Sequence, residues 1–221
     1  MTEQDQIEPR NALGDDVYAA LLRSIIEGEY PAHSRLKERE ISQRFAVSRV
    51  PVREALRRLE ADGFVVSEQN RGARVVAVTT TDINDIFDLR LCIEPFAASR
   101  AAERVAAGEA STTRLRQLLV MAETSTDPDT AQGANLDFHA EIVSMSANAG
   151  LVRALAPVRG RMEWIFRLTR DQRGVEHALE HRQLLEAIDA GNERSAAALT
   201  TAHIEMGRAP ILTALADLLE N

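Results

Sequence analysis

The sequence has one cysteine, few aromatic residues and no long hydrophobic run, and each of these scarcities excludes a class of protein. Cys92 alone cannot form an internal disulfide, which excludes a small secreted domain held by disulfides. No apolar stretch approaches the roughly 18 residues that a membrane span needs. The first eight residues are polar and acidic, which argues against a secretory signal. We therefore expect a cytoplasmic protein with no membrane partner.

Length and composition indicate a folded chain of moderate size. The chain has 221 residues, of which 45% are hydrophobic and 27% charged, so it can bury a core and is not intrinsically disordered. We expect a disordered tail over residues 1–11 and two modest domains over residues 12–78 and 79–221.

The charges are unevenly distributed along the chain. The net charge is −8, yet residues 35–74 contain ten basic against six acidic residues, whereas residues 79–221 contain 14 arginines against 21 acidic residues. A locally basic segment therefore belongs to an otherwise acidic chain. All but one of the 26 basic residues are arginine, which suits bidentate contacts to phosphate or guanine, although a high-GC genome would give the same bias.

The basic segment has the pattern of three short helices. Apolar residues from Val17 to Ile26 follow a helical period, with Asp15 or Asp16 as the expected cap and Gly28 as the end. Leu36, Ile41 and Phe45 predict a second helix. The third begins with Ser48 as N-cap, ends at Gly63, and buries its apolar face, which consists of Val52, Ala55, Leu56 and Leu59.

An extended pattern follows these helices. Residues 64–68 and 73–78 predict a β-hairpin with a basic tip over residues 69–72. Three helices and a hairpin are the layout of a winged helix-turn-helix, whose third helix enters the DNA major groove. Arg49 and Arg53 lie on one face at the start of that helix, opposite its apolar side. Each arginine taken alone could be an ordinary surface charge, and it is their combination with the hairpin that favours DNA recognition.

The motifs of this segment resemble those of the GntR family of bacterial transcription regulators. The resemblance covers residues 12–78 and is carried by Leu-Lys-Glu-Arg-Glu-Ile over 36–41 and by Ser-Arg-Val-Pro-Val-Arg-Glu-Ala-Leu over 48–56. It implies a double-stranded DNA operator as partner. The DNA-binding residues implied are Arg39, Ser48, Arg49 and Arg53, with Arg71 and Gly72 at the wing tip. Ala32-His33 and Ala46 depart from the usual Pro-Gly and Gly of the family.

Everything after a polar joint at residues 78–81 is predicted to be helical. We place helices near residues 82–107, 111–124, 128–147, 150–169, 174–190 and 193–219, the last kinked at Pro210. The predicted fold is thus mainly α: an N-terminal winged helix-turn-helix followed by an all-α antiparallel bundle, whose cavity is the expected functional site.

Three histidines lie on apolar faces of separate predicted helices. His139 shares a face with Asn135 and Ile142, His181 flanks Leu185, and His203 aligns with Leu199. A single histidine in such a position is usually satisfied by hydrogen bonds. Three that converge in a dry bundle favour a transition metal.

This region resembles the FCD effector-binding domain of the FadR subfamily over residues 80–216. The resemblance is carried by Asn135-x-x-Phe138-His139, by Glu180-His181 with the apolar residues that follow, and by His203. It implies a divalent metal, commonly Zn²⁺ or Ni²⁺, held by Asn135, His139, His181 and His203 beside a small organic acid. Asn135 takes the place of the more usual Asp, which removes one charge from the site.

Arg90 falls within the apolar stripe of its predicted helix, where a guanidinium needs an anionic partner. One reading pairs it with Glu94, one turn later. The other directs it into the metal cavity, where it would hold an effector carboxylate, as the matching residue of the FCD family is thought to do. We assign Arg90 and Glu94 to effector binding.

The sequence therefore predicts a metabolite-responsive regulator, and not an enzyme, that binds a pseudo-palindromic operator as a homodimer and responds to a small carboxylate beside a metal. Two alternatives stay open. A metal-dependent hydrolase or lyase could use the same histidines, although no nucleophile accompanies them. A structural dimeriser with a vestigial, metal-free pocket is the third reading, which a metal assay separates from the other two.

Overall fold

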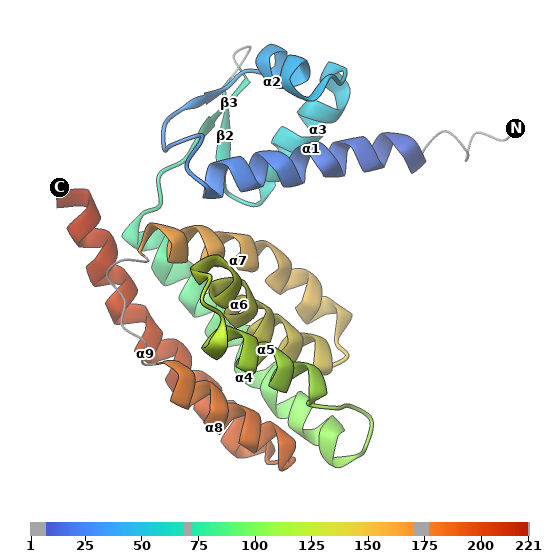
Figure 1. The fold of residues 1–221 in the computed structure, drawn as a ribbon, viewed down its shortest axis with the longest axis vertical. Helices are drawn as coiled ribbons and strands as arrows, with labels where there is room; N and C mark the ends of the chain where they lie inside the picture. Colours follow the sequence, from blue (N-terminus) through green and yellow to red (C-terminus); the bar gives the residue numbers. More distant parts are fainter. Residues whose placement is uncertain (1–7, 69–71, 170–176, 221) are drawn as a thin grey trace, which may run out of the picture. The chain divides into compact units, whose positions relative to one another are not determined.

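The computed structural model describes residues 8–68, 72–169 and 177–220 and divides the chain into two compact units, residues 1–78 and 79–221 (Figure 1). Helices dominate both units, which confirms the predicted fold class. No helix among these residues is long and apolar enough to cross a membrane.

The first unit contains three helices: α1 (Glu8–Ile26), α2 (Glu38–Phe45) and α3 (Arg49–Ala61). The apolar face of α3 lies against α1 and α2, with Val52 and Leu59 fully buried. Helix α3 ends just before Gly63, whose φ of 76° is the left-handed conformation that glycine adopts at a helix end. A loop of residues 46–48 joins α2 to α3, the predicted recognition helix, and the two helices pack against each other.

A small antiparallel sheet completes this unit. Its strands are β1 (Arg35–Leu36), β2 (Val65–Glu68) and β3 (Gly72–Val75), in the order β1-β3-β2. The predicted hairpin is confirmed, and its register pairs Glu68 with Gly72. Residues 69–71, including Arg71, lie outside the described residues.

Two sequence-based expectations for this unit are wrong. Helix α1 begins at Glu8, well before the expected cap at Asp15 or Asp16, so residues 8–11 are helical and do not belong to a disordered tail. Residues 1–7 lie outside the described residues. Leu36 belongs to β1, because it pairs with Ala73 and is fully buried there. A two-residue strand has too short a pattern to be distinguished from the start of a helix.

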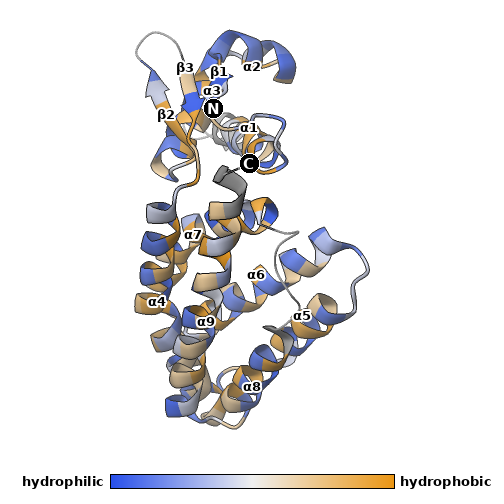
Figure 2. Ribbon diagram, turned by 90° about the vertical axis from the view of Figure 1, so that its left-hand side faces the viewer, coloured by the Kyte–Doolittle hydropathy of each residue, from blue (hydrophilic) through white to orange (hydrophobic). Residues whose placement is uncertain are grey.

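The second unit consists of helices within the described ranges. These are α4 (Thr80–Ala106), α5 (Thr113–Thr124), α6 (Pro128–Met145), α7 (Ala149–Leu168), α8 (His177–Asp189) and α9 (Glu193–Glu220). Hydrophilic and hydrophobic residues alternate along each of them, as in amphipathic helices (Figure 2). Helix α9 runs beside α4 and continues through Pro210 (Figure 1).

Capping and small residues fix the position of α4. Thr79 and Asp82 form a capping box, in which the Thr79 hydroxyl accepts from the Asp82 N–H and the Asp82 carboxylate accepts from the Thr79 N–H. Further along α4, Ala97, Ala98 and Ala101 are fully buried. Small side chains let neighbouring helices approach closely, and the core between them is filled by larger residues such as Phe138 and Ile142 of α6.

Candidate DNA-binding surface and metal centre

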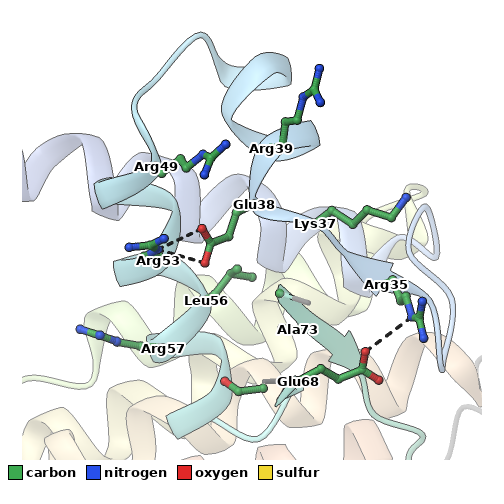
Figure 3. Close-up of a pocket in the computed structure, with 12 residues that line it drawn as sticks. Arg35, Lys37, Glu38, Arg39, Arg49, Arg53, Leu56, Arg57, Glu68 and Ala73 are labelled. Atoms are coloured by element: carbon green, nitrogen blue, oxygen red, sulfur yellow. Dashed lines mark hydrogen bonds and ion pairs between the residues drawn. The ribbon is translucent and has the colours of Figure 1, made fainter. Parts of the chain in front are cut away.

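Basic side chains make up half of the residues that line a groove of about 790 Å³ on the first unit (Figure 3). Three of them come from α3, one from α2, and two from β1 and the residue that follows it: Arg49, Arg53, Arg57, Arg39, Arg35 and Lys37. They belong to a chain with a net charge of −8. The groove is therefore a local basic surface suited to an anionic partner such as the DNA backbone.

Helical and strand periodicity explain why these side chains gather. Arg49, Arg53 and Arg57 are spaced four residues apart, so they share one face of α3, while Val52 and Leu56 are buried. Arg35 of β1 and Lys37, the residue after the strand, flank the buried Leu36 and therefore point to the other side. The same apolar positions that build the core thus turn the basic side chains outward.

Acidic side chains hold some of these arginines in place. Arg53 Nε lies 3.0 and 2.9 Å from the two carboxylate oxygens of Glu38 (Figure 3). Arg35 Nε lies 3.5 Å from Glu68. Within the described part of the chain, Arg39 and Arg49 make no ion pair and are exposed. The groove thus combines two arginines that contact carboxylates with two exposed arginines whose guanidinium groups are available to a ligand.

The structure brings most of the predicted DNA-binding residues to this groove. Arg39, Arg49, Arg53 and Gly72 line it. Ser48 is exposed at the N-cap of α3, but its side chain makes no capping hydrogen bond and it does not line the groove.

Sequence reasoning missed Arg35, Lys37 and Arg57 in this groove. Arg57 could have been found, because it continues the four-residue spacing of Arg49 and Arg53. Arg35 and Lys37 could not, because their placement depends on β1.

In the second unit, the three predicted histidines converge. His139 of α6, His181 of α8 and His203 of α9 are all buried. Their Nε2 atoms lie 3.2 Å from one another in each of the three pairs. Three separate helices therefore direct the same ring atom to one point.

Two glutamates face the opposite nitrogens of two of these rings. Glu180 Oε2 lies 2.7 Å from His203 Nδ1. Glu94 Oε2 lies 2.9 Å from His139 Nδ1, a short contact that is poorly aligned for a hydrogen bond. A carboxylate beside Nδ1 favours the tautomer that carries its proton there and leaves Nε2 with a lone pair.

Glu94 also holds the buried Arg90. Arg90 Nε donates to Glu94 Oε1 at 2.6 Å, and its guanidinium lies 5.4 Å from the centre of the Phe87 ring. Burial alone would raise the pKa of Glu94, but the positive charge of Arg90 and the contact with His139 together outweigh it and lower the pKa to about 2. Glu94 is therefore an anion that links Arg90 to the histidine cluster.

A small cavity of about 30 Å³ lies between Arg90 and two of the histidines, His139 and His203. It is lined by Phe87, Arg90, Asn135, His139, Phe166, His203, Gly207 and Ile211. Asn135 Oδ1 is buried without a hydrogen-bond partner. A buried amide oxygen in that state is costly unless a ligand satisfies it. Glu94 does not line the cavity. It contacts Arg90 and His139, which do line it.

These residues fit a divalent transition metal. If Nδ1 of His139 and of His203 carries the proton, their Nε2 lone pairs face each other at 3.2 Å, which is repulsive without a cation between them. Zn–N bonds of about 2.0–2.1 Å place neighbouring ligand atoms roughly 3.0–3.4 Å apart, which matches the observed spacing. Imidazole nitrogens and an amide oxygen are acceptable ligands for Zn²⁺ or Ni²⁺.

The sequence did not reveal that two glutamates would face the Nδ1 atoms of the histidines. Glu180 precedes His181 in sequence, yet it contacts His203 on another helix, so its role follows from helix packing and not from spacing. Glu94 and Arg90 were recognised as a possible i,i+4 pair. The structure shows that the pair exists and that Arg90 also lines the cavity.

Comparison with known families agrees with this architecture. A model of the gntR family of bacterial regulatory proteins matches residues 13–75, and a model of the FCD domain matches residues 85–206. The chain belongs to the GntR family of transcriptional regulators and carries an FCD domain. The FadR subfamily is consistent with this combination. FCD domains typically bind a metal, and GntR regulators bind DNA and are generally dimeric.

Several relatives cover most of this GntR-family chain. The HTH-type transcriptional regulator YdhC of Bacillus subtilis is 28% identical over 192 residues, covering 84% of this chain and 85% of its own length. A probable D-xylose utilization operon transcriptional repressor of Paenarthrobacter nicotinovorans is 25% identical over 196 residues, covering 88% and 87%. These relatives are named as transcriptional regulators, which favours regulation over hydrolase or lyase activity.

Solved structures share the fold. A putative GntR regulator from Rhodococcus sp. RHA1 is 26% identical with a TM-score of 0.76, covering 90% of this chain and 97% of its own. Escherichia coli McbR/YncC is 20% identical with a TM-score of 0.72, and the match covers 91% of this chain and 97% of its own. At this identity the match shows only that the two chains have the same fold.

Proposed function

We propose that this GntR-family protein is a metabolite-responsive regulator that binds a pseudo-palindromic operator as a homodimer. The basic groove on α3 and β1 would contact the duplex, with Arg49 and Arg53 reading base edges and Arg39 contacting phosphate. Ser48, Gly72 and Arg71 would complete the contact at the start of α3 and at the wing. Such a protein would act in the cytoplasm, where it meets DNA.

The second part of the proposal is a metal held by His139, His181, His203 and Asn135. The observation that carries it is the 3.2 Å approach of His139 Nε2 to His203 Nε2 while carboxylates face both Nδ1 atoms. A bound Zn²⁺ or Ni²⁺ would supply positive charge that attracts one oxygen of an acid. Asn135 Oδ1, which has no partner in the cavity, would supply a neutral oxygen ligand.

The effector we propose is a small carboxylate gripped by Arg90. Arg90 lines the cavity while Glu94 accepts from its Nε and Nη2, so Nη1 and the second N–H of Nη2 can donate to an acid. Glu94 would act as a positioning residue. The cavity of about 30 Å³ holds no more than a water or two, so an acid of several atoms requires the surrounding side chains to move. That movement would link effector binding to operator affinity.

The experiment that tests this function combines selection of duplex DNA with a ligand screen. Metal-loaded protein is used to select binding sites from random duplexes, and operator affinity is then measured with a panel of small mono- and dicarboxylates. We expect an inverted repeat and at least one acid that changes affinity by about 5- to 150-fold. Selection of no specific duplex would contradict the DNA-binding part. An intact operator response after complete metal removal would contradict the metal-linked effector part.

A further inference from the structure

The outward face of α4 carries an apolar stripe that no other element of the described chain covers. Leu89 is 42% exposed and Phe96 is 54% exposed, and Cys92 between them is also exposed. These residues recur at i, i+3 and i+7, so they lie along one side of the helix. Exposed apolar groups of this size in a row are a common mark of a protein interface.

The opposite face of α4 is buried within its own unit. Ile86, Ile93 and Ala97 are buried, and α4 packs against α6, α7, α8 and α9. Helix α4 lies at an edge of the helical unit (Figure 2). The stripe is thus a second apolar face on a helix that already contributes to the core.

Charged residues flank the stripe with opposite signs at its two ends. Asp85 lies one turn before Leu89, and Arg100 lies one turn after Phe96. Asp85 is exposed and makes no ion pair among the described residues. Arg100 contacts Glu103 of the same helix through Nη1, so its guanidinium retains other N–H groups for a second carboxylate.

The order of these residues is self-complementary for antiparallel pairing. The midpoint between Asp85 and Arg100 is the same point as the midpoint between Leu89 and Phe96, and it falls between Cys92 and Ile93. A two-fold axis at that point would set Leu89 against Phe96 of a second copy and Asp85 against its Arg100. An isologous interface requires this reciprocal matching.

We infer that α4 is the face through which two copies of this chain pair, antiparallel, about a two-fold axis beside Cys92. The inference rests on the proposed homodimer and adds where its subunits meet. Leu89 and Phe96 supply the apolar centre, and Asp85 and Arg100 set the direction and register of the two helices.

The first test measures molar mass by sedimentation equilibrium for the full metal-loaded chain. Phe96→Asp puts a charge in the centre of the interface in both copies, and we expect it to weaken dimerisation by about a hundredfold or more. Val120→Asp is the matched control, since Val120 on α5 is 57% exposed and lies outside the stripe. Circular dichroism verifies that both variants remain helical.

The second test uses the single cysteine as a reporter of register. Packed helices lie about 8–10 Å apart, so a short bismaleimide can join Cys92 to its symmetry mate. We expect rapid formation of a covalent dimer from the wild-type chain and none from Cys92→Ser. A Cys92→Ser/Val120→Cys chain, in which the thiol is moved to α5, should give little covalent dimer at the same concentration.

The outcomes separate this inference from the function on which it rests. A wild-type chain that is monomeric with or without operator DNA overturns the homodimer itself. A dimer that Phe96→Asp leaves intact and that bismaleimide does not join at Cys92 overturns the α4 interface and leaves the homodimer standing. A dimer weakened by Asp85→Arg and restored by the further change Arg100→Asp supports the antiparallel register.

Discussion

His139 and His203 lie with their Nε2 atoms 3.2 Å apart, although a carboxylate faces the Nδ1 atom of each ring. If both rings carry their proton on Nδ1, neither can donate to the other, and the two Nε2 lone pairs repel unless a cation lies between them. The pair comes from α6 and α9, and the cation would therefore connect helices that are distant in sequence.

Metal removal should destabilise the helical unit. A metal present at 100 times its dissociation constant stabilises the folded chain by about 2.7 kcal/mol, so a chelator should lower the melting temperature and added Zn²⁺ should restore it. His139→Ala and His203→Ala should lose stoichiometric metal by elemental analysis. His33→Asn, at a left-handed loop position that Asn tolerates, is the histidine control and should keep the metal. Full metal content in His139→Ala would contradict the site.

The two glutamates should differ in what they stabilise. Glu94→Gln and Glu180→Gln each remove a carboxylate that orients a histidine, and each should weaken metal binding by about 10- to 100-fold. Glu94 also neutralises the buried Arg90, so Glu94→Gln should further destabilise the metal-free chain by about 3 kcal/mol in urea unfolding. Equal unfolding free energies for the two metal-free variants would show that Arg90 finds another partner.

Arg90 should separate effector response from DNA binding. Arg90→Ala should leave operator affinity unchanged and abolish the effect of the acid on that affinity, because it removes the donor that lines the cavity. Fluorescence anisotropy on operator DNA with increasing acid is the measurement. A variant that responds at the wild-type concentration would place the acid elsewhere, with Arg161, paired with Asp82, and Arg167, paired with Asp129, as the next candidates.

Groove arginines should divide into those that read sequence and those that bind phosphate. Arg49→Ala and Arg53→Ala should each cost about 1–3 kcal/mol on the operator and relax discrimination at one base pair. Arg39→Ala should weaken all duplexes alike and reduce the salt dependence. Arg44 is a matched control, since it is exposed on α2 but bound to Glu29 and outside the groove. An Arg44→Ala effect as large as that of Arg49→Ala would argue for general charge attraction.

Gly72 has a structural role that substitution should expose. Its φ is 89°, and a Cβ there would lie 2.3 Å from the carbonyl oxygen of Leu36, so Gly72→Ala should destabilise the first unit by about 2 kcal/mol or more. Gly28 has a φ of 81° and open space around it, so Gly28→Ala should cost only about 1 kcal/mol. Urea unfolding of both variants measures the difference, and equal losses would exclude a steric contribution at Gly72.

The sequence by itself determined the order of the helices and the hairpin, and it determined which histidines point into the helical unit. The apolar period of α3 turns Arg49 and Arg53 outward whatever surrounds them, because core residues and basic residues occupy opposite sides of one helix. The same argument directs His139 and His203 inward. Helical periodicity is local, and a stretch of about a dozen residues reveals it.

Only the tertiary structure decided which groups meet. The pairing of Glu180 with His203, the approach of three Nε2 atoms and the place of Arg35 beside α3 depend on how helices and strands pack. Leu36 was misplaced for the same reason, because β1 exists only through its pairing with β3. Periodicity fixes the direction of a side chain within one element, whereas the distance between two elements is set by the packing of all their neighbours.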